Sequence, residues 1–166
     1  MKRARITGWL ARWLPKLLLA SGLLLVGVPP ALADEQTLEI IGPDQTSHTL
    51  DMSELASFPQ TEITTSTPWT EAATYSGPLL QNVLQHLGLS IEAITAIGAD
   101  GYRAGFSWAE GGKYQPILAI ARNGAPLPFR EQGPIWLLFP FNDQPDIQSD
   151  PWYFRAVWQV VRLEVH

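Results

Sequence analysis

Aromatic and polar side chains gather at several turns of this sequence, where together they could hold a flat ligand. Trp69 follows a Thr-Pro pair, Tyr102 follows Asp100-Gly101, and Arg122 precedes Asn-Gly. Aromatic faces bind planar heterocycles by stacking, while carboxylate and guanidinium groups bind the ring edge. These turns, with the run 152–155, give six candidate binding residues: Trp69, Asp100, Tyr102, Arg122, Tyr153 and Arg155. A structural role for the same rings stays open.

Catalytic and metal-binding patterns are weak by comparison. The three histidines, His48, His86 and His166, have no second histidine or carboxylate at ligand spacing. The sequence contains neither a Gly-x-Ser-x-Gly nucleophile turn nor a glycine-rich phosphate loop. The acidic stretch 142–150 contains a proline and no turn glycine, which favours a solvated loop over a calcium or magnesium site.

The 166 residues include no cysteine. This excludes disulfides, thiolate metal sites and cysteine nucleophiles within the sequence. The domain must therefore be stabilised by packing, and we expect Trp136 and Trp158 to lie in its core, because both fall in or near apolar runs.

The elements that position these residues follow from hydrophobic periodicity. Alternating or apolar runs bounded by turn residues predict strands at 37–41, 48–50, 62–67, 93–97, 101–108, 117–121, 135–139 and 157–165. Helices are predicted at 51–58 and 78–87, the second with Pro78 in its first turn and Gly88 as its stop. The pattern is typical of an α+β domain with a mixed β-sheet and a few short helices.

The first 33 residues have the features of a cleavable signal peptide. Basic residues precede the apolar run 17–28, and Ala31-Leu32-Ala33 is a small-x-small cleavage site. Arg3 and Arg5 are not adjacent, so the signal is interpreted as general secretory rather than twin-arginine. We expect a single domain at 34–166, located in the periplasm, with secretion as the second choice.

The predicted mature domain is strongly acidic. All 16 acidic residues follow residue 33, whereas five of the 11 basic residues precede it. Nucleic acids and anionic membrane surfaces select clustered lysine and arginine, so neither is an expected partner.

Five short motifs in a fixed order resemble the sulfite-oxidase-type molybdopterin-binding domain family. They are Thr67-Pro68-Trp69 with 75–80, Asp100-Gly101-Tyr102, 118–127, Gly133-Pro134 through Pro140, and the closing Trp158 with Leu163-Glu164-Val165. The resemblance covers about residues 37–165. It implies the family's α+β fold, a sulfite-oxidase-like molybdopterin-binding fold, for the whole mature chain.

The resemblance also carries expectations about the cofactor. Catalytic members of the family bind molybdenum through a cysteine upstream of the segment that matches Trp69. Here that region is 64–67, with hydroxyl side chains only, and the family's histidine and arginine look replaced by Gln132 and Trp136. A hydroxyl is a poor substitute for a soft thiolate, so we expect a pterin as ligand and no molybdenum.

The small, exported, cysteine-less branch of the family resembles periplasmic pterin-binding partners of membrane sensors. We therefore expect a non-catalytic pterin-binding module that reports its ligand to a membrane signalling protein. In this interpretation Trp69 or Tyr102 stacks on the pterin, Asp100 accepts from its edge, and Arg122 or Arg155 donates to its carbonyl. Two alternatives stay open: a molybdopterin-dependent oxidoreductase, and a ligand-free interaction domain on the same fold. Enzymatic activity is left undecided, with the missing cysteine weighing against it.

Overall fold

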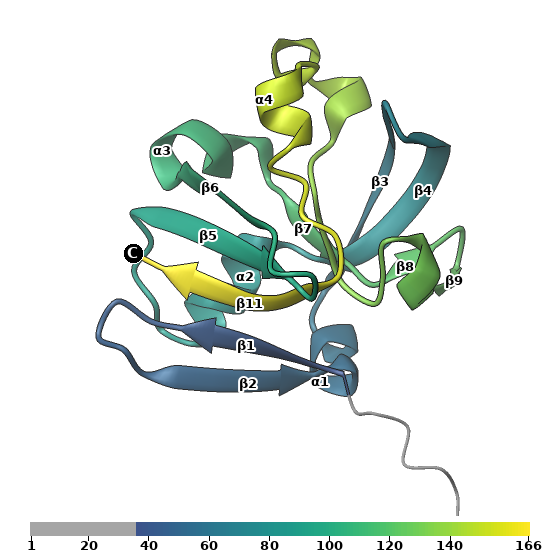
Figure 1. Cartoon of the computed structure of the whole chain (residues 1–166). Helices are drawn as coiled ribbons and strands as arrows, with labels where there is room; N and C mark the ends of the chain where they lie inside the picture. Colours follow the sequence, from purple (N-terminus) through teal and green to yellow (C-terminus); the bar gives the residue numbers. More distant parts are fainter. Residues whose placement is uncertain (1–35) are drawn as a thin grey trace, which may run out of the picture. The chain divides into compact units, whose positions relative to one another are not determined.

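The largest sheet is five-stranded, with the order β2-β1-β11-β5-β6 (Figure 1). The computed structural model describes residues 36–166, so the predicted signal peptide lies outside the described residues. The strands of this sheet are β1 (Thr37–Ile41), β2 (Ser47–Asp51), β5 (Ala93–Gly98), β6 (Arg103–Ser107) and β11 (Val160–Val165). Strand β11 lies at the centre, parallel to β1 and antiparallel to β5.

A second sheet has the order β3-β4-β8-β9. The strands of this second sheet are β3 (Gln60–Thr67), β4 (Thr70–Pro78), β8 (Ala121–Arg122) and β9 (Ala125–Pro126). A separate two-stranded ladder joins β7 to β10. The ladder consists of β7 (Ile117–Ala119) and β10 (Trp136–Leu138). Strands β3 and β4 form a hairpin that closes at the pair Thr67↔Thr70, which leaves Trp69 in the connecting turn.

Two helices follow local capping chemistry. Helix α1 (Met52–Ser57) begins at Asp51, whose side chain and that of Glu54 form a reciprocal capping box. Helix α2 (Leu80–His86) ends at Gly88, which has a φ of 70° and donates to Gln85 O, while Leu89 donates to Leu84 O. This is the Schellman arrangement that a C′ glycine permits. Pro78 was predicted in the first helical turn, but it ends β4 instead.

Several short helical segments connect the strands: α3 (Trp108–Gly111), η1 (Gly112–Tyr114), η2 (Phe129–Glu131), η3 (Phe141–Asp143), η4 (Pro145–Ile147) and α4 (Asp150–Tyr153). The strand predicted at 101–108 stops at Ser107, because Trp108 turns into α3 and stacks on Phe106. The stretch 142–150 is folded into η3 and η4 and leads into α4, anchored by the buried side chains of Ile147 and Trp152.

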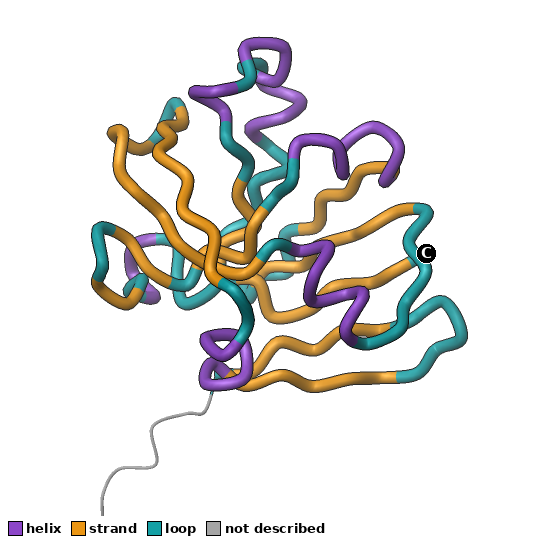
Figure 2. Tube along the Cα trace, turned by 180° about the vertical axis from the view of Figure 1, so that it is seen from behind, coloured by secondary structure: helices purple, strands orange, loops and turns teal. Residues whose placement is uncertain are grey.

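The core lies between the sheets, and α2 covers one face of the five-stranded sheet with Leu80, Val83 and Leu84 (Figure 2). Trp136 is fully buried, as expected from its apolar run. The same expectation was wrong for Trp158, which is 39% exposed. The next residue has a left-handed backbone, so the chain turns there before it enters β11.

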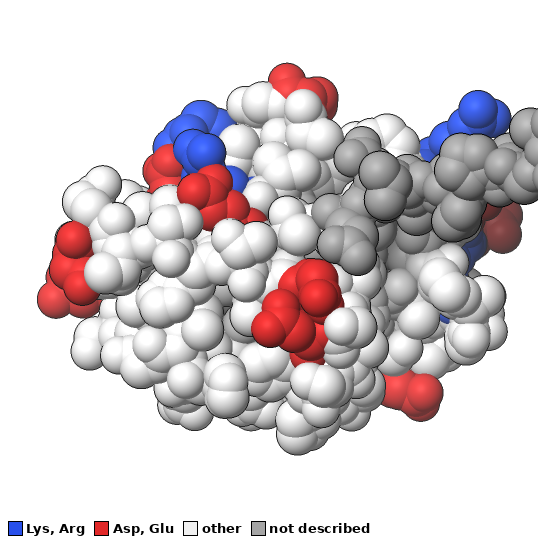
Figure 3. Space-filling model, turned by 90° about the horizontal axis from the view of Figure 1, so that it is seen from below, with Lys and Arg blue, Asp and Glu red and all other residues white. Residues whose placement is uncertain are grey.

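Arginine charge on the described domain is largely neutralised by neighbouring carboxylates. Four ion pairs occur: Arg103–Glu164, Arg122–Glu131, Arg155–Glu110 and Arg162–Glu39. On the face seen in Figure 3, acidic residues form separate groups over a mostly uncharged surface, and basic residues lie near its margins. None of the helices within residues 36–166 has the length and apolar character of a membrane span.

Candidate functional site

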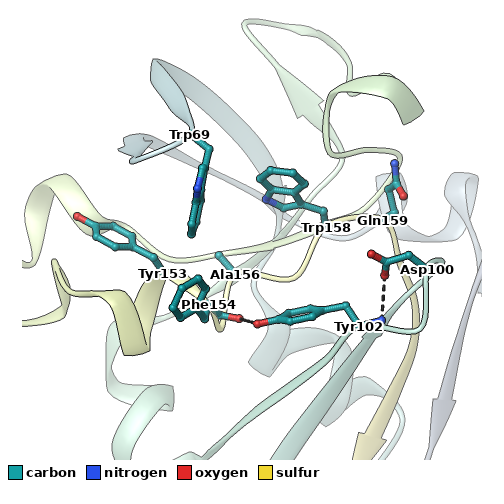
Figure 4. A pocket seen from close by; sticks show the side chains of 8 residues that line it. All are labelled: Trp69, Asp100, Tyr102, Tyr153, Phe154, Ala156, Trp158 and Gln159. Atoms are coloured by element: carbon teal, nitrogen blue, oxygen red, sulfur yellow. Dashed lines mark hydrogen bonds between the residues drawn. The ribbon is translucent and has the colours of Figure 1, made fainter.

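A pocket of about 180 Å³ opens where three chain segments meet (Figure 4). The segments are the β3–β4 turn, the β5–β6 turn and the connection between α4 and β11. The wall consists of Trp69, Asp100, Tyr102, Tyr153, Phe154, Ala156, Trp158 and Gln159. Five of these eight residues are aromatic, so the wall offers flat apolar surfaces with a few polar groups between them.

Trp69 is held by the threonines at the two ends of its turn. Its backbone N–H donates to Thr67 Oγ1 at 3.3 Å, and Thr70 Oγ1 accepts from Thr67 N at 3.2 Å. The indole is half exposed. It lies 5.8 Å from the Phe154 ring and 6.1 Å from the Trp158 ring, measured between centroids. The ring is therefore fixed at its base and open on one side, as a stacking surface requires.

The β5–β6 turn supplies a carboxylate at the opposite side of the pocket. Asp100 Oδ1 accepts from Tyr102 N at 2.9 Å, and Gly101 has a φ of 83° that lets the chain reverse. The second oxygen, Oδ2, has no hydrogen-bond partner among the described residues and points into the pocket (Figure 4). Tyr102 Oη donates to Phe154 O at 2.8 Å, which ties this turn to the α4–β11 connection.

Gln159 is the most constrained residue of the wall. Its φ is 49°, a left-handed conformation that is uncommon outside glycine and tends to occur at functional sites. Its backbone N–H donates to Gln132 O, and its carbonyl accepts from Ala99 N, each at 2.9 Å. Its side-chain Nε2 donates to Phe129 O at 2.7 Å. These bonds hold both the backbone and the amide of Gln159 in one orientation.

The structure brings together four of the six predicted site residues: Trp69, Asp100, Tyr102 and Tyr153. Arg122 and Arg155 do not line the pocket. Arg122 pairs with Glu131 at 3.2 Å and lies over the Tyr75 ring, and Arg155 pairs with Glu110 at 3.1 Å and stacks on Trp152. Their expected role as donors to a ligand carbonyl has no support from their positions.

Four wall residues were not among the predicted candidates: Phe154, Ala156, Trp158 and Gln159. Phe154 could have been found, because it belongs to the aromatic run 152–155 that was singled out. Trp158 was assigned to the core. Gln159 carried no sequence signal, since its importance depends on a backbone angle that no residue pattern encodes.

The segment 64–67, which was expected from the sequence resemblance to replace the family's metal-binding cysteine, offers only hydroxyl side chains. Thr65 is fully buried, and its Oγ1 has no partner among the described residues. Ser66 Oγ donates to Asn142 Oδ1 at 3.0 Å. Within residues 36–166, no group of three or more His, Cys, Asp or Glu residues is placed to hold a metal ion. The segment 64–67 therefore offers no sulfur ligand for a metal, whereas the pocket is lined mainly by flat aromatic rings.

A family profile described as "Oxidoreductase molybdopterin binding domain" matches residues 26–142, more than half of the chain. The chain belongs to this family. Its α+β architecture, a mixed sheet with few short helices, confirms the fold expected from the sequence. No curated protein matches the chain.

The fold of this molybdopterin-binding family domain also occurs in a solved enzyme. The crystal structure of the sulfane dehydrogenase SoxCD from Paracoccus pantotrophus superimposes with a TM-score of 0.61 at 20% sequence identity. The match covers 80% of this chain but only 39% of that one, so the chain spans about two-fifths of its length. At this identity the similarity concerns the fold.

Proposed function

We propose that this domain is a non-catalytic periplasmic module that binds a pterin and reports it to a membrane signalling protein. The observation that carries the proposal is the pocket itself. The rings of Trp69 and Tyr102 are each about half exposed, and Asp100 lines the same pocket with one carboxylate oxygen that accepts no hydrogen bond from the described residues. A pterin has a planar bicyclic ring and an aminopyrimidine edge rich in donors, which matches a stacking surface next to an acceptor.

The size of the pocket supports a small ligand. Pockets that enclose drug-sized molecules have volumes of about 300–1,000 Å³. The volume here, about 180 Å³, suits one bicyclic ring with its substituents in solvent. A dinucleotide form of the molybdenum cofactor would extend well beyond these walls.

The proposal that no molybdenum is bound rests on the chemistry of the side chains. The sequence has no cysteine, and the segment 64–67, where the resemblance places the family's metal ligand, has no sulfur. The alternative, a molybdopterin-dependent oxidoreductase, is supported by the family to which the domain belongs. Metal analysis of protein purified from its native envelope separates the two proposals, because stoichiometric molybdenum would support the oxidoreductase.

Export and partner binding are supported by the sequence alone. The predicted signal peptide at 1–33 supports delivery to the periplasm. The acidic mature domain favours a receptor with a basic face, since complementary charges speed association and select partners. Isolation of envelope proteins cross-linked to the domain, with and without pterin, tests whether a membrane protein binds it in a ligand-dependent way.

Tryptophan fluorescence tests ligand binding directly. We expect saturable quenching when residues 34–166 are titrated with oxidised and reduced pterins, and loss of the response in Trp69→Ala. Trp108→Phe is the matched control, because it removes a tryptophan outside the pocket and keeps a ring beside Phe106. Because Trp158 also lines the pocket, the decisive quantity is the affinity: quenching with unchanged pterin affinity in Trp69→Ala would contradict the role of Trp69.

A ligand-free interaction domain is the remaining candidate, favoured by the exposure of the pocket rim. Trp69, Tyr102, Phe154 and Trp158 are between 39% and 52% exposed. Aromatic residues are enriched at protein–protein interfaces, so this rim would also suit a protein partner. Absence of quenching with every pterin, combined with a partner that is captured by wild type and lost in Trp69→Ala, would favour this candidate.

A further inference from the structure

The charge of the pocket restricts what it can bind. Among the described residues that line it, Asp100 is the only one with a charged side chain. The rest of the wall is aromatic or neutral. A negatively charged group entering the pocket would therefore meet a carboxylate and find no cation in the wall to offset the loss of its hydration.

The two arginines that were predicted to contact a ligand are engaged in other contacts. Arg155 follows the wall residue Phe154, but its guanidinium carbon lies 4.3 Å from the centroid of the Trp152 ring and it pairs with Glu110. Arg122 is engaged by Glu131. Drawing either guanidinium toward a ligand would break an ion pair as well as a cation–π contact.

The amide of Gln159 provides a second acceptor. Phe129 O is a carbonyl and can only accept, so the group that faces it at 2.7 Å must be the Nε2 of Gln159. This fixes the amide oxygen on the other side, and Figure 4 shows it on the side of Asp100. The same logic applies to Asp100, whose Oδ1 is held by Tyr102 N so that Oδ2 is free. Two residues with oriented acceptor oxygens thus line the same end of the pocket.

Two acceptors select a ligand edge that carries two donors. The 2-amino-4-oxo ring of a pterin presents its amino group and its N3–H side by side. A 2,4-dioxo ring, as in lumazine or a flavin, places a carbonyl oxygen where the amino group would be. That oxygen would face the Asp100 carboxylate without a proton between them, which leaves two acceptors opposed.

We infer that the pocket selects an unphosphorylated 2-aminopteridine, and rejects both phosphate esters and 2-oxo pteridines. The inference rests on the proposed function and specifies the ligand class of the same site. It separates this domain from a site for molybdopterin, because molybdopterin carries a phosphate group. Recognition depends on the donor pattern of the ring edge and on the absence of an anionic tail.

Isothermal titration of residues 34–166 with three probes tests the inference: neopterin, neopterin monophosphate and lumazine. We expect neopterin to bind, and the ester and lumazine to bind about tenfold more weakly or worse, since a charge-assisted hydrogen bond or an opposed charge changes affinity on that scale. The difference in affinity between neopterin and its monophosphate should decrease as the salt concentration is raised, because the opposing charges are exposed.

Asp100→Asn provides a sharper test, because it should change the preference of the pocket and preserve its shape. Tyr102 N would still require an oxygen, so the new amide would turn its NH₂ group into the pocket. Lumazine should then bind at least as well as neopterin, and the difference in affinity between neopterin and its monophosphate should become smaller. Glu62→Gln removes an exposed carboxylate on β3 outside the pocket and should leave the order of affinities unchanged.

The outcomes distinguish the inference from the function on which it rests. Equal affinity for neopterin and its monophosphate, or for neopterin and lumazine, would overturn the inference while pterin binding stands. Failure of neopterin and of every other pterin to bind would overturn both. A preference that does not change in Asp100→Asn, in a protein whose circular dichroism is unaltered, would remove Asp100 from recognition.

Discussion

The indole of Trp69 meets the indole of Trp158 edge to face, with centroids 6.1 Å apart and an interplanar angle of 85°. The two rings come from the β3–β4 turn and from the segment before β11, which are distant in sequence. Trp158 also meets the buried Trp136 edge to face, at 6.3 Å. The pocket wall is therefore continuous with the aromatic core, and the position of Trp69 depends on a contact as well as on its own turn.

A double-mutant cycle should detect this contact. Aromatic pairs contribute about 0.5–1.5 kcal/mol beyond the area that they bury, and partial exposure places this pair near the lower end. We expect Trp69→Ala and Trp158→Ala to show a coupling of about 0.5 kcal/mol in the free energy of unfolding, measured by urea denaturation. Strict additivity of the two changes would mean that the rings meet without stabilising each other.

Removal of the Tyr75 hydroxyl should not destabilise the domain. Tyr75 is fully buried, and its Oη has no hydrogen-bond partner among the described residues. A buried polar group without a partner costs about 1–3 kcal/mol. Tyr75→Phe should therefore leave the free energy of unfolding unchanged or raise it by about 1 kcal/mol.

Tyr114→Phe is the matched control for this change. The Tyr114 hydroxyl donates to Asp146, so its loss should lower stability by about 1 kcal/mol. Chemical denaturation of both variants gives the comparison. A marked loss of stability in Tyr75→Phe would show that the hydroxyl is satisfied by a group beyond the protein, such as an internal water molecule.

Gly77 should not tolerate a side chain. A Cβ at this position of β4 would lie 1.9 Å from Leu118 O and 2.9 Å from Ala119 Cα, both backbone atoms of β7. Backbone atoms in a ladder cannot move aside as a flexible side chain can, so Gly77→Ala should cost about 3 kcal/mol or more.

Gly88→Ala provides a contrast in mechanism to Gly77→Ala. A Cβ at Gly88 meets nothing within 4 Å, but φ is 70°, so only backbone strain of about 1–2 kcal/mol is expected. Thermal denaturation of the two variants should separate steric clash from strain. Similar losses in both would argue against the close approach of β4 and β7.

Acid should destabilise the domain through carboxylates with lowered pKa values. Hydrogen bonds from Ser53 and the Glu54 backbone lower the pKa of Asp51, and Arg162 followed by Ser47 lowers the pKa of Glu39. A lowered folded-state pKa stabilises the fold above the unfolded-state value, near 4, and this stabilisation disappears as pH falls through the folded-state value. Stability should therefore decline below about pH 4.

Asp51→Asn isolates one of these contributions. Asparagine is also a good N-cap, so stability at neutral pH should change little, while the decline below about pH 4 should become less steep. Urea denaturation at pH 7 and pH 3 provides the comparison. An identical decline in wild type and variant would show that Asp51 does not contribute to acid sensitivity.

Much of the fold could be predicted because its strands carry local periodicity. Strand β1 was placed at its observed bounds, and the stop of α2 at Gly88 followed from glycine chemistry alone. Strand β4 was not predicted, because its small and polar residues form no apolar pattern, and its place depends on pairing with β3. The predicted end of β6 was one residue too late, because the alternation of apolar side chains continues to Trp108 although the extended backbone ends at Ser107.

The site was predicted where a turn fixes the direction of a short or rigid side chain. Asp100 and Trp69 point into the pocket because their own turns hold them. Arg122 and Arg155 also lie close to turns, but their long side chains form ion pairs with Glu131 and Glu110. These pairings could not be predicted from the sequence, because each carboxylate belongs to a different structural element from its arginine. Pterin specificity, export and the partner remain predictions.

The central position of β11 has a consequence for how the domain folds. In this sheet β1 and β5 both pair with β11, which follows every other strand of the domain in sequence (Figure 1). The remaining pairings of the sheet are the two antiparallel pairs β1–β2 and β5–β6, which only β11 connects. Contacts between the two ends of a chain also form slowly. Closing the five-stranded sheet therefore requires β1 to meet a strand that is distant in sequence, and we expect this sheet to be completed late in folding.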